Sequence, residues 1–109
     1  MPRINADREE PMPAYLISTI EITDAAAYED YRKLVGPVLQ KYGGRFLARG
    51  GKIDYLEGQW KPKRVVIVEF DSMEKARAFS ESPEYAPAKA ARHRASISSV
   101  IVVDGLPPA

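Results

Sequence analysis

Hydrophobic positions along the chain follow two patterns, a strand-like alternation and a helical spacing of three to four residues. Four runs rich in β-branched and aromatic side chains predict β-strands: residues 14–22, 45–49, 64–70 and 99–103. Gly50 and Gly51 indicate a bulge, after which residues 53–57 are expected to continue the second strand. The strands are therefore separated by segments long enough to hold helices or hairpin turns.

An amphipathic helix is predicted between the first two strands. Its apolar stripe recurs at helical spacing: Tyr28, Tyr31, Val35, Val38, Leu39 and Tyr42. Asp24 offers an N-cap and Gly43 ends the helix, while Pro37 predicts a kink or break near Gly36. This helix is expected to bury one face against the sheet.

A second helical region is predicted between the last two strands. Asp71 can cap its start, and Ser82-Pro83 is expected to restart it. The resulting order βαββαβ predicts a ferredoxin-like α+β fold, with a four-stranded antiparallel sheet and its helices on one face. Residues 14–106 would form this single domain, and residues 1–13 would be a flexible N-terminal extension.

The sheet carries more apolar positions than one covered face requires. Two helices in this topology cover a single face, so the other should be polar at every second position. Instead, residues 65–68 and 100–103 are apolar on both faces. A single chain would expose a larger apolar patch than monomers usually tolerate, so we expect a homodimer packed sheet face to sheet face. The alternative is that the N-terminal extension or loops cover the open face.

The composition excludes several classes of protein. The 109 residues include 16 Lys+Arg and 15 Asp+Glu, so the net charge of +1 gives no footprint for nucleic acid. No cysteine and a single histidine argue against a metal site, and no apolar run is long enough for a membrane helix. The first residues lack the apolar region of a signal peptide. We therefore expect a cytoplasmic protein without metal, cofactor, nucleic-acid or membrane partner.

Six short segments, in order and with little room for insertions, resemble one bacterial family. They are residues 14–15 (AY), 42–51 (YGGRFLARGG), 57–64 (EGQWKPKR), 68–70 (VEF), 82–85 (SPEY) and 103–105 (VDG). Together they resemble the domain-of-unknown-function thirteen-thirty family. The resemblance implies the dimeric α+β barrel superfamily, hence a homodimer, but no settled reaction. Relatives by fold include cofactor-free monooxygenases, lactone isomerases, haem-degrading enzymes and ligand-binding regulator domains, among which fold alone does not choose.

Arg92 and Glu69 are the charged candidates for a site. Arg92 shares a helical face with Tyr85, Ala88 and Ala95, the face expected to meet the sheet. A guanidinium there needs either an anionic ligand or a buried carboxylate such as Glu69. Glu69 itself could act as a base if the dimer buries it. Alternatively, it lies partly hydrated at the strand end and pairs with an arginine.

Aromatic side chains are the second group of candidates. The hydroxyls of Tyr28, Tyr31 and Tyr85 could line a pocket between helix and sheet, and Tyr31 could also move a proton. The alternative is that they are core residues whose hydroxyls reach the rim. Trp60 could cover a ligand or contact a partner, or simply pack on its own hairpin.

The remaining candidates are basic. Arg45 could cluster with Arg49 and Arg64 on neighbouring strands and attract an anionic substrate, unless these are hydrated positions balanced by acids. His93 lies on the flank of its helix and is expected at the surface.

Three functions remain open from sequence. The first is an enzyme without metal that acts on a small anionic or aromatic metabolite. In it Arg92 would hold the anion, Glu69 or a tyrosine would move a proton, and Trp60 would close the site. The second is a module that binds a metabolite without chemistry, and the third is a structural dimer with a filled core.

Overall fold

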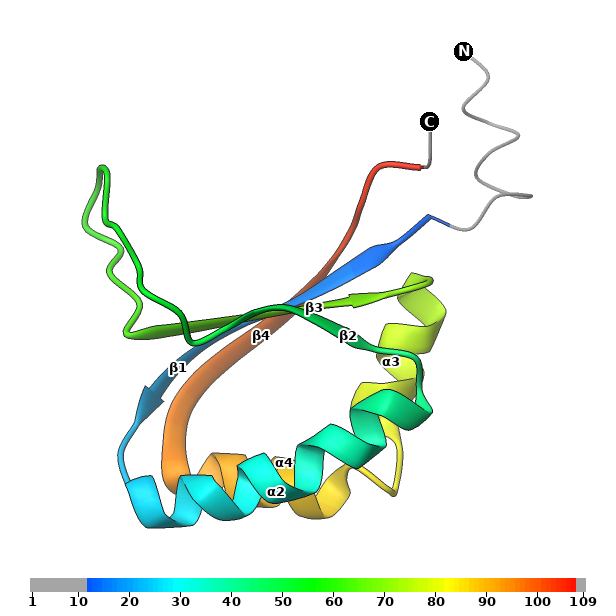
Figure 1. The fold of residues 1–109 in the computed structure, drawn as a ribbon, viewed down its shortest axis with the longest axis horizontal. Helices are drawn as coiled ribbons and strands as arrows, with labels where there is room; N and C mark the ends of the chain where they lie inside the picture. Colours follow the sequence, from blue (N-terminus) through cyan, green and yellow to red (C-terminus); the bar gives the residue numbers. More distant parts are fainter. Residues whose placement is uncertain (1–11, 108–109) are drawn as a thin grey trace.

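The computed structural model describes residues 12–107 and contains one four-stranded antiparallel sheet with helices on one of its faces (Figure 1). The elements in chain order are β1 (Ala14–Ile22), α2 (Ala25–Lys41), β2 (Arg45–Arg49), β3 (Arg64–Phe70), α3 (Met73–Glu81), α4 (Ala86–Ala95) and β4 (Ser96–Asp104). The strand order β2-β3-β1-β4 places β1 and β3 in the centre. The ferredoxin-like prediction is confirmed, with its second helical region divided into α3 and α4.

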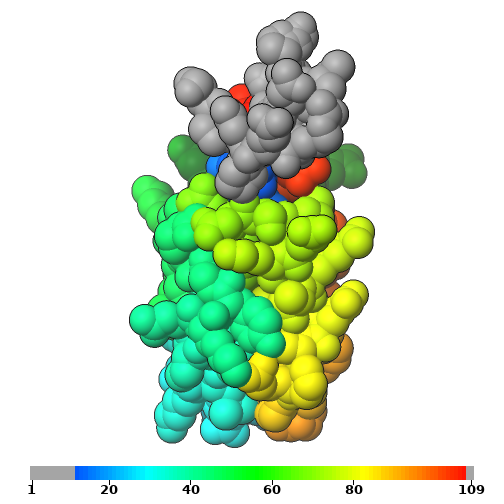
Figure 2. All heavy atoms as spheres, turned by 90° about the vertical axis from the view of Figure 1, so that its right-hand side faces the viewer, coloured from blue at the N-terminus to red at the C-terminus, as the bar shows by residue number. Residues whose placement is uncertain are grey.

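The alternation of the central strands decides which side chains meet the helices. Leu16, Ser18 and Ile20 of β1 are buried on the helix side, and Val66 and Val68 of β3 lie opposite them in register. The helices α2 and α4 lie side by side beneath this face (Figures 1 and 2). The core therefore occupies the layer between the sheet and the helices, and any internal site must be built within that layer.

A kink or break was predicted near Gly36, and helix α2 is continuous through Pro37, so there is no break. Asp24 caps the start, with its carboxylate accepting a hydrogen bond from the Ala27 amide at 3.1 Å. Pro37 is exposed, so the carbonyl group that loses its partner inside the helix can be hydrated. Val35 and Leu39, on either side of it, are buried and hold the helix against the sheet.

Residues 50–63 form a long projecting loop, which we call the arm (Figure 1). The expected strand at 53–57 is wrong, because the arm leaves the sheet at Gly50, whose φ of 72° turns the chain. The predicted bulge is also misplaced, since the register shift lies between Phe46 and Ala48. The arm carries exposed apolar side chains, with Leu56 85% and Trp60 73% exposed.

The second helical region begins slightly later than predicted. Ser72, rather than Asp71, caps α3 by accepting a hydrogen bond from the Lys75 amide at 3.1 Å. Ser82 separates the two helices, because its hydroxyl donates to the Phe79 carbonyl at 2.9 Å and accepts from the Tyr85 amide at 3.1 Å. This turn leads directly into α4 and so sets the position of the residues on its inner face.

The sheet face opposite the helices has an apolar centre. Ile17 of β1 lies in register between Ile67 of β3 and Ile101 of β4, and Ile101 is 60% exposed. We call the face around these three residues the open sheet face. No described helix covers it (Figure 1), and no helix within residues 12–107 is long and apolar enough to span a bilayer. Residues 1–11, most of the predicted extension, lie outside the described part of the chain.

Candidate ligand cavity

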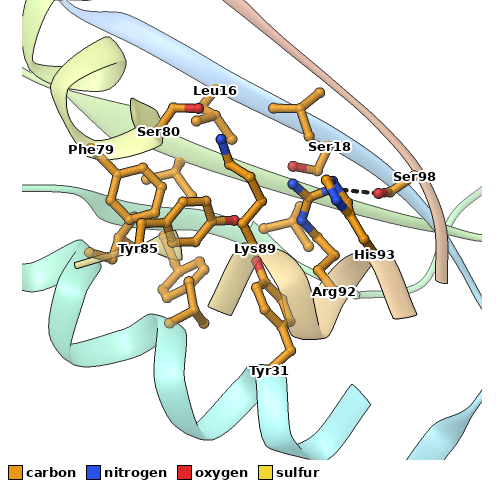
Figure 3. Close-up of a pocket in the computed structure, with 16 residues that line it drawn as sticks. Leu16, Ser18, Tyr31, Phe79, Ser80, Tyr85, Lys89, Arg92, His93 and Ser98 are labelled. Carbon is orange, nitrogen blue, oxygen red and sulfur yellow. Dashed lines mark hydrogen bonds between the residues drawn. The ribbon is translucent and has the colours of Figure 1, made fainter. Parts of the chain in front are cut away.

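A cavity of about 300 Å³ lies between the helix side of the sheet and helices α2, α3 and α4 (Figure 3). Its apolar part comes from the core: Leu16, Val35, Leu39, Phe46, Val66, Val68, Phe79 and Val100. Its polar part is a set of hydroxyl and basic side chains: Ser18, Tyr31, Ser80, Tyr85, Lys89, Arg92, His93 and Ser98. A volume of this size is at the small end of ligand pockets, so the cavity suits a small molecule.

Arg92 reaches the cavity from α4. Ala88, Ala91 and Ala95 on the same helical face are fully buried, so α4 lies close to the sheet and the longer Arg92 must extend along the cavity. Helix α4 ends where the Ser96 hydroxyl donates to the Arg92 backbone carbonyl at 2.7 Å. The base of the arginine side chain is thereby fixed at the junction of helix and strand.

The Arg92 guanidinium is buried with most of its hydrogen-bonding capacity unused. The residue is 6% exposed, one terminal nitrogen donates to the Ser98 hydroxyl at 2.5 Å, and Nε has no partner. In Figure 3 the Ser18 hydroxyl also points toward this end of the cavity. A guanidinium has five N–H donors, so the site retains donors for an incoming group.

No described carboxylate lies within ion-pairing distance of Arg92. The ion pair between Arg92 and Glu69, the alternative drawn from the sequence, is wrong. Successive residues of β3 face opposite sides of the sheet, and Glu69 faces away from the side on which Val68 and Phe70 are buried. Glu69 instead accepts a hydrogen bond from Arg45 at 3.4 Å. The buried cation is therefore not neutralised by any acid among residues 12–107.

Two tyrosine hydroxyls face each other beside the guanidinium. Tyr31 comes from α2 and Tyr85 from the start of α4, and Figure 3 shows their hydroxyls pointing toward one another. Burial raises the pKa of Tyr31 well above its usual value, and the neighbouring Tyr85 hydroxyl raises it further, whereas the positive charge of Arg92 opposes the shift. The raised pKa favours the protonated hydroxyl of Tyr31, which can donate a hydrogen bond.

Several cavity residues were not identified from the sequence. Lys89 and His93, one helical turn apart on α4, line the cavity together with Ser18, Ser80 and Ser98. The sequence could have indicated Ser18, because it is a polar residue between apolar ones on the buried side of a strand. His93 is exposed, as expected, but lies at the cavity.

Three candidate residues besides Glu69 lie elsewhere. Tyr28 is only 2% exposed and packs against Tyr31, with ring centroids 5.3 Å apart, as part of the core. Arg45 is on the other side of the sheet, where it also bonds to Asp71 at 3.2 Å and lowers the pKa of that carboxyl. Trp60 is exposed on the arm. The structure thus brings together Arg92, Tyr31 and Tyr85, but not Tyr28, Arg45, Trp60 or Glu69.

The described residues offer no cluster for a metal ion. Within residues 12–107 there is no group of three or more His, Cys, Asp or Glu side chains placed to hold one. The polar lining of the cavity consists of hydroxyl groups and basic side chains, which suit the oxygens of an anion. The arrangement can bind an organic anion and donate hydrogen bonds to an oxygen that carries negative charge.

Comparisons with known proteins agree with this architecture. The family described as "Domain of unknown function (DUF1330)" matches residues 13–106. A protein of unknown function from Rhodopseudomonas palustris is 22% identical, with a TM-score of 0.72 over 99% of this chain and 95% of that one. A variant of SnoaB, a cofactor-independent oxygenase from Streptomyces nogalater, is 15% identical, with a TM-score of 0.60 over 84% and 90%.

A dimeric ferredoxin-like protein of unknown function from Thermobifida fusca is also similar. It is 16% identical, with a TM-score of 0.51 over 86% of this chain and 92% of that one. At these identities the likeness concerns the fold alone. No functionally curated protein matches the chain.

Proposed function

The chain belongs to the DUF1330 family, and from that premise we propose that it is a homodimeric small-molecule enzyme that binds a small organic anion in its internal cavity. The cavity lies between helices and sheet, and Arg92 holds the anion. The protein's own side chains supply the hydrogen-bonding groups of the reaction. The fold is shared with proteins that include a cofactor-independent oxygenase, which supports an enzyme without a bound cofactor.

The observation that carries this proposal is the buried, unneutralised guanidinium of Arg92. Removing a charged group from water costs several kcal/mol unless a counter-charge compensates it. Among the described residues the compensation is one serine hydroxyl, while Nε has no partner. A carboxylate in the cavity would accept two parallel hydrogen bonds from the guanidinium and neutralise it. The site is therefore electrostatically incomplete without an anion.

The tyrosine pair suggests where chemistry takes place. A substrate anchored on Arg92 would have a neighbouring oxygen close to the Tyr31 and Tyr85 hydroxyls, and donation to that oxygen would stabilise an enolate or phenolate form. Glu69 is separated from the cavity by the sheet, so it is not the base of this site. The His93 imidazole also lines the cavity, and imidazole is a common general base.

A non-catalytic binding module is the second candidate. It is favoured by the lack of any carboxylate among the cavity-lining residues, since such a group is a common general base. The two candidates share the same ligand site and differ only in turnover. Loss of turnover in an Arg92 variant that still folds favours the enzyme, whereas ligand binding with no turnover of any bound compound favours the module.

The homodimer is part of the proposal. The open sheet face, with Ile17, Ile67 and Ile101 in register, would be covered by the same face of a second copy. One protein of similar fold is described as dimeric and ferredoxin-like, which supports this assembly. Pairing two such faces by a two-fold axis would remove the apolar surface from water without covering the helix-side cavity.

Native mass spectrometry of freshly purified protein tests the anion site and the assembly together. We expect a dimer mass with a small organic acid retained, and loss of that acid in Arg92→Met. The matched control is Arg94→Met, because Arg94 lies on the same helix but is exposed. If wild-type protein retains no acid and calorimetry detects no binding of small carboxylates, the proposed function is wrong.

A further inference from the structure

The cavity contains two separate cationic groups, both supplied by α4. Arg92 and Lys89 are three residues apart, so their side chains leave the same side of the helix. In Figure 3 they diverge, with Arg92 extending toward Ser98 and Lys89 extending toward Ser80. The charged ends therefore lie at different parts of one cavity, with the tyrosine hydroxyls beside them.

Lys89, like Arg92, has no acidic partner among residues 12–107. The acid that precedes it most closely in the sequence, Glu84, is bound to Lys41 and accepts a hydrogen bond from Tyr42 at 2.5 Å. The ammonium of Lys89 lies 5.8 Å from the centre of the Tyr85 ring, a weak cation–π contact that leaves its charge uncompensated.

Two uncompensated cations in one partly buried cavity repel each other, and a single negative charge can neutralise only one of them. Lys89 is half-buried, and none of the residues 12–107 places a carboxylate in the cavity, so a ligand that reaches both ends can supply the second counter-charge. We propose that the ligand is a small dianion of the dicarboxylate class. One carboxylate binds Arg92 with Ser98, and the other binds Lys89 on the Ser80 side.

The apolar part of the cavity fits the body of such a molecule. Leu16, Val66 and Val68 line the same cavity as the two cationic groups, so the carbon chain or ring linking the carboxylates would contact aliphatic side chains. This inference rests on the proposed function for the Arg92 end, and Lys89 adds a second requirement that the first proposal does not contain. The two can therefore fail separately.

Paired probes separate the two requirements. Wild-type protein is titrated at neutral pH by calorimetry with succinate, glutarate and adipate, and with the monocarboxylates of equal length, butyrate, valerate and hexanoate. A charge-assisted hydrogen bond at a partly buried site is worth about tenfold in affinity. We expect at least one dicarboxylate to bind about tenfold more tightly than its monocarboxylate partner.

Substitutions test which residue produces the preference for dicarboxylates. Lys89→Met should abolish the advantage of the dicarboxylate and leave monocarboxylate affinity within about twofold, since it removes only the second charge. Lys33→Met is the matched control, because Lys33 is exposed on α2 away from the cavity and should retain the full advantage. Arg92→Lys, which keeps the charge but not the bidentate geometry, should weaken both ligand series about equally.

The outcomes separate the two proposals. If monocarboxylates bind as tightly as dicarboxylates, or Lys89→Met keeps the preference, the dianion inference is overturned while the Arg92 site stands. If wild-type protein binds neither series, or if loss of Arg92 changes neither, both proposals are overturned. Circular dichroism of each variant establishes that it is folded before titration.

Discussion

Replacing Arg92 by methionine should make the ligand-free protein more stable while removing the proposed anion site. The guanidinium is buried, receives compensation from one serine hydroxyl and leaves Nε without a partner. Methionine keeps most of the length of the side chain and fits irregular apolar space, but carries no charge to desolvate. A residue retained for binding is expected to cost stability in this way, whereas a structural arginine would not.

The expected gain in the free energy of unfolding is the desolvation cost that is removed minus the hydrogen bond that is lost. Burying the charge without an acid costs several kcal/mol, although the opening of the cavity to solvent reduces this cost. The hydrogen bond to Ser98 is worth about 1.5–3 kcal/mol because the donor is charged. We therefore expect the free energy of unfolding to rise by about 1–2 kcal/mol, a net of these two opposing terms. At about 4–8 °C per kcal/mol for a domain of this size, Tm should rise by about 4–16 °C.

Urea denaturation followed by circular dichroism measures this change, with wild type and variant at one protein concentration because assembly would contribute to stability. Arg94→Met, at an exposed position of the same helix, should change the unfolding free energy by less than about 0.5 kcal/mol. If Arg92→Met instead lowers stability by more than about 1 kcal/mol, the guanidinium is a structural element. Arg92 would then not be a residue kept for ligand binding at the expense of stability.

Three further predictions concern other parts of the molecule. Burial raises the pKa of Tyr31, so the unfolded chain loses the hydroxyl proton first as pH rises above about 10, and the free energy of unfolding should fall with pH. Tyr31→Phe should reduce the slope of unfolding free energy against pH, measured by urea denaturation, by up to about 1.4 kcal/mol per pH unit. An unchanged slope would contradict this. Gly50→Ala should lower the free energy of unfolding by about 1–2 kcal/mol, because φ at Gly50 is 72° and a Cβ would collide with the Arg64 side chain. Gly51→Ala should not, because a Cβ at Gly51 would face open space. Equal effects of the two alanines on Tm would contradict the turn geometry. For the proposed dimer, Ile101→Lys should give a monomer in sedimentation velocity, whereas Leu34→Lys on the outer side of α2 should not. An Ile101→Lys variant that stays dimeric would exclude the open sheet face as the interface.

The fold and one part of the site could be predicted from the sequence. The strands are rich in β-branched residues, and the helix that contains Tyr28 and Tyr31 has a clear apolar stripe. Helical periodicity alone places Arg92 on the inner face of its helix. Such periodic patterns depend only on the local geometry of helices and strands, so they can be read without knowing the tertiary structure. The position of Arg92 next to Tyr85 at the cavity follows from the same helical spacing.

The side of the sheet on which Glu69 lies could not be predicted. Because β3 is apolar at consecutive positions, its pattern does not show which alternate set of side chains meets the helices. The pairing of Arg92 with Glu69 therefore remained open until the register with β1 was known. The arm posed a different problem, since residues 53–57 have the composition of a strand but no neighbouring strand to pair with.

The position of Trp60 gives the protein an intrinsic optical probe. It is the sole tryptophan among the 109 residues, and it lies on the arm rather than in the cavity. Its fluorescence therefore reports the surroundings of the arm. Occupation of the cavity should leave the emission wavelength unchanged, whereas contact of the arm with another molecule should shift it to the blue.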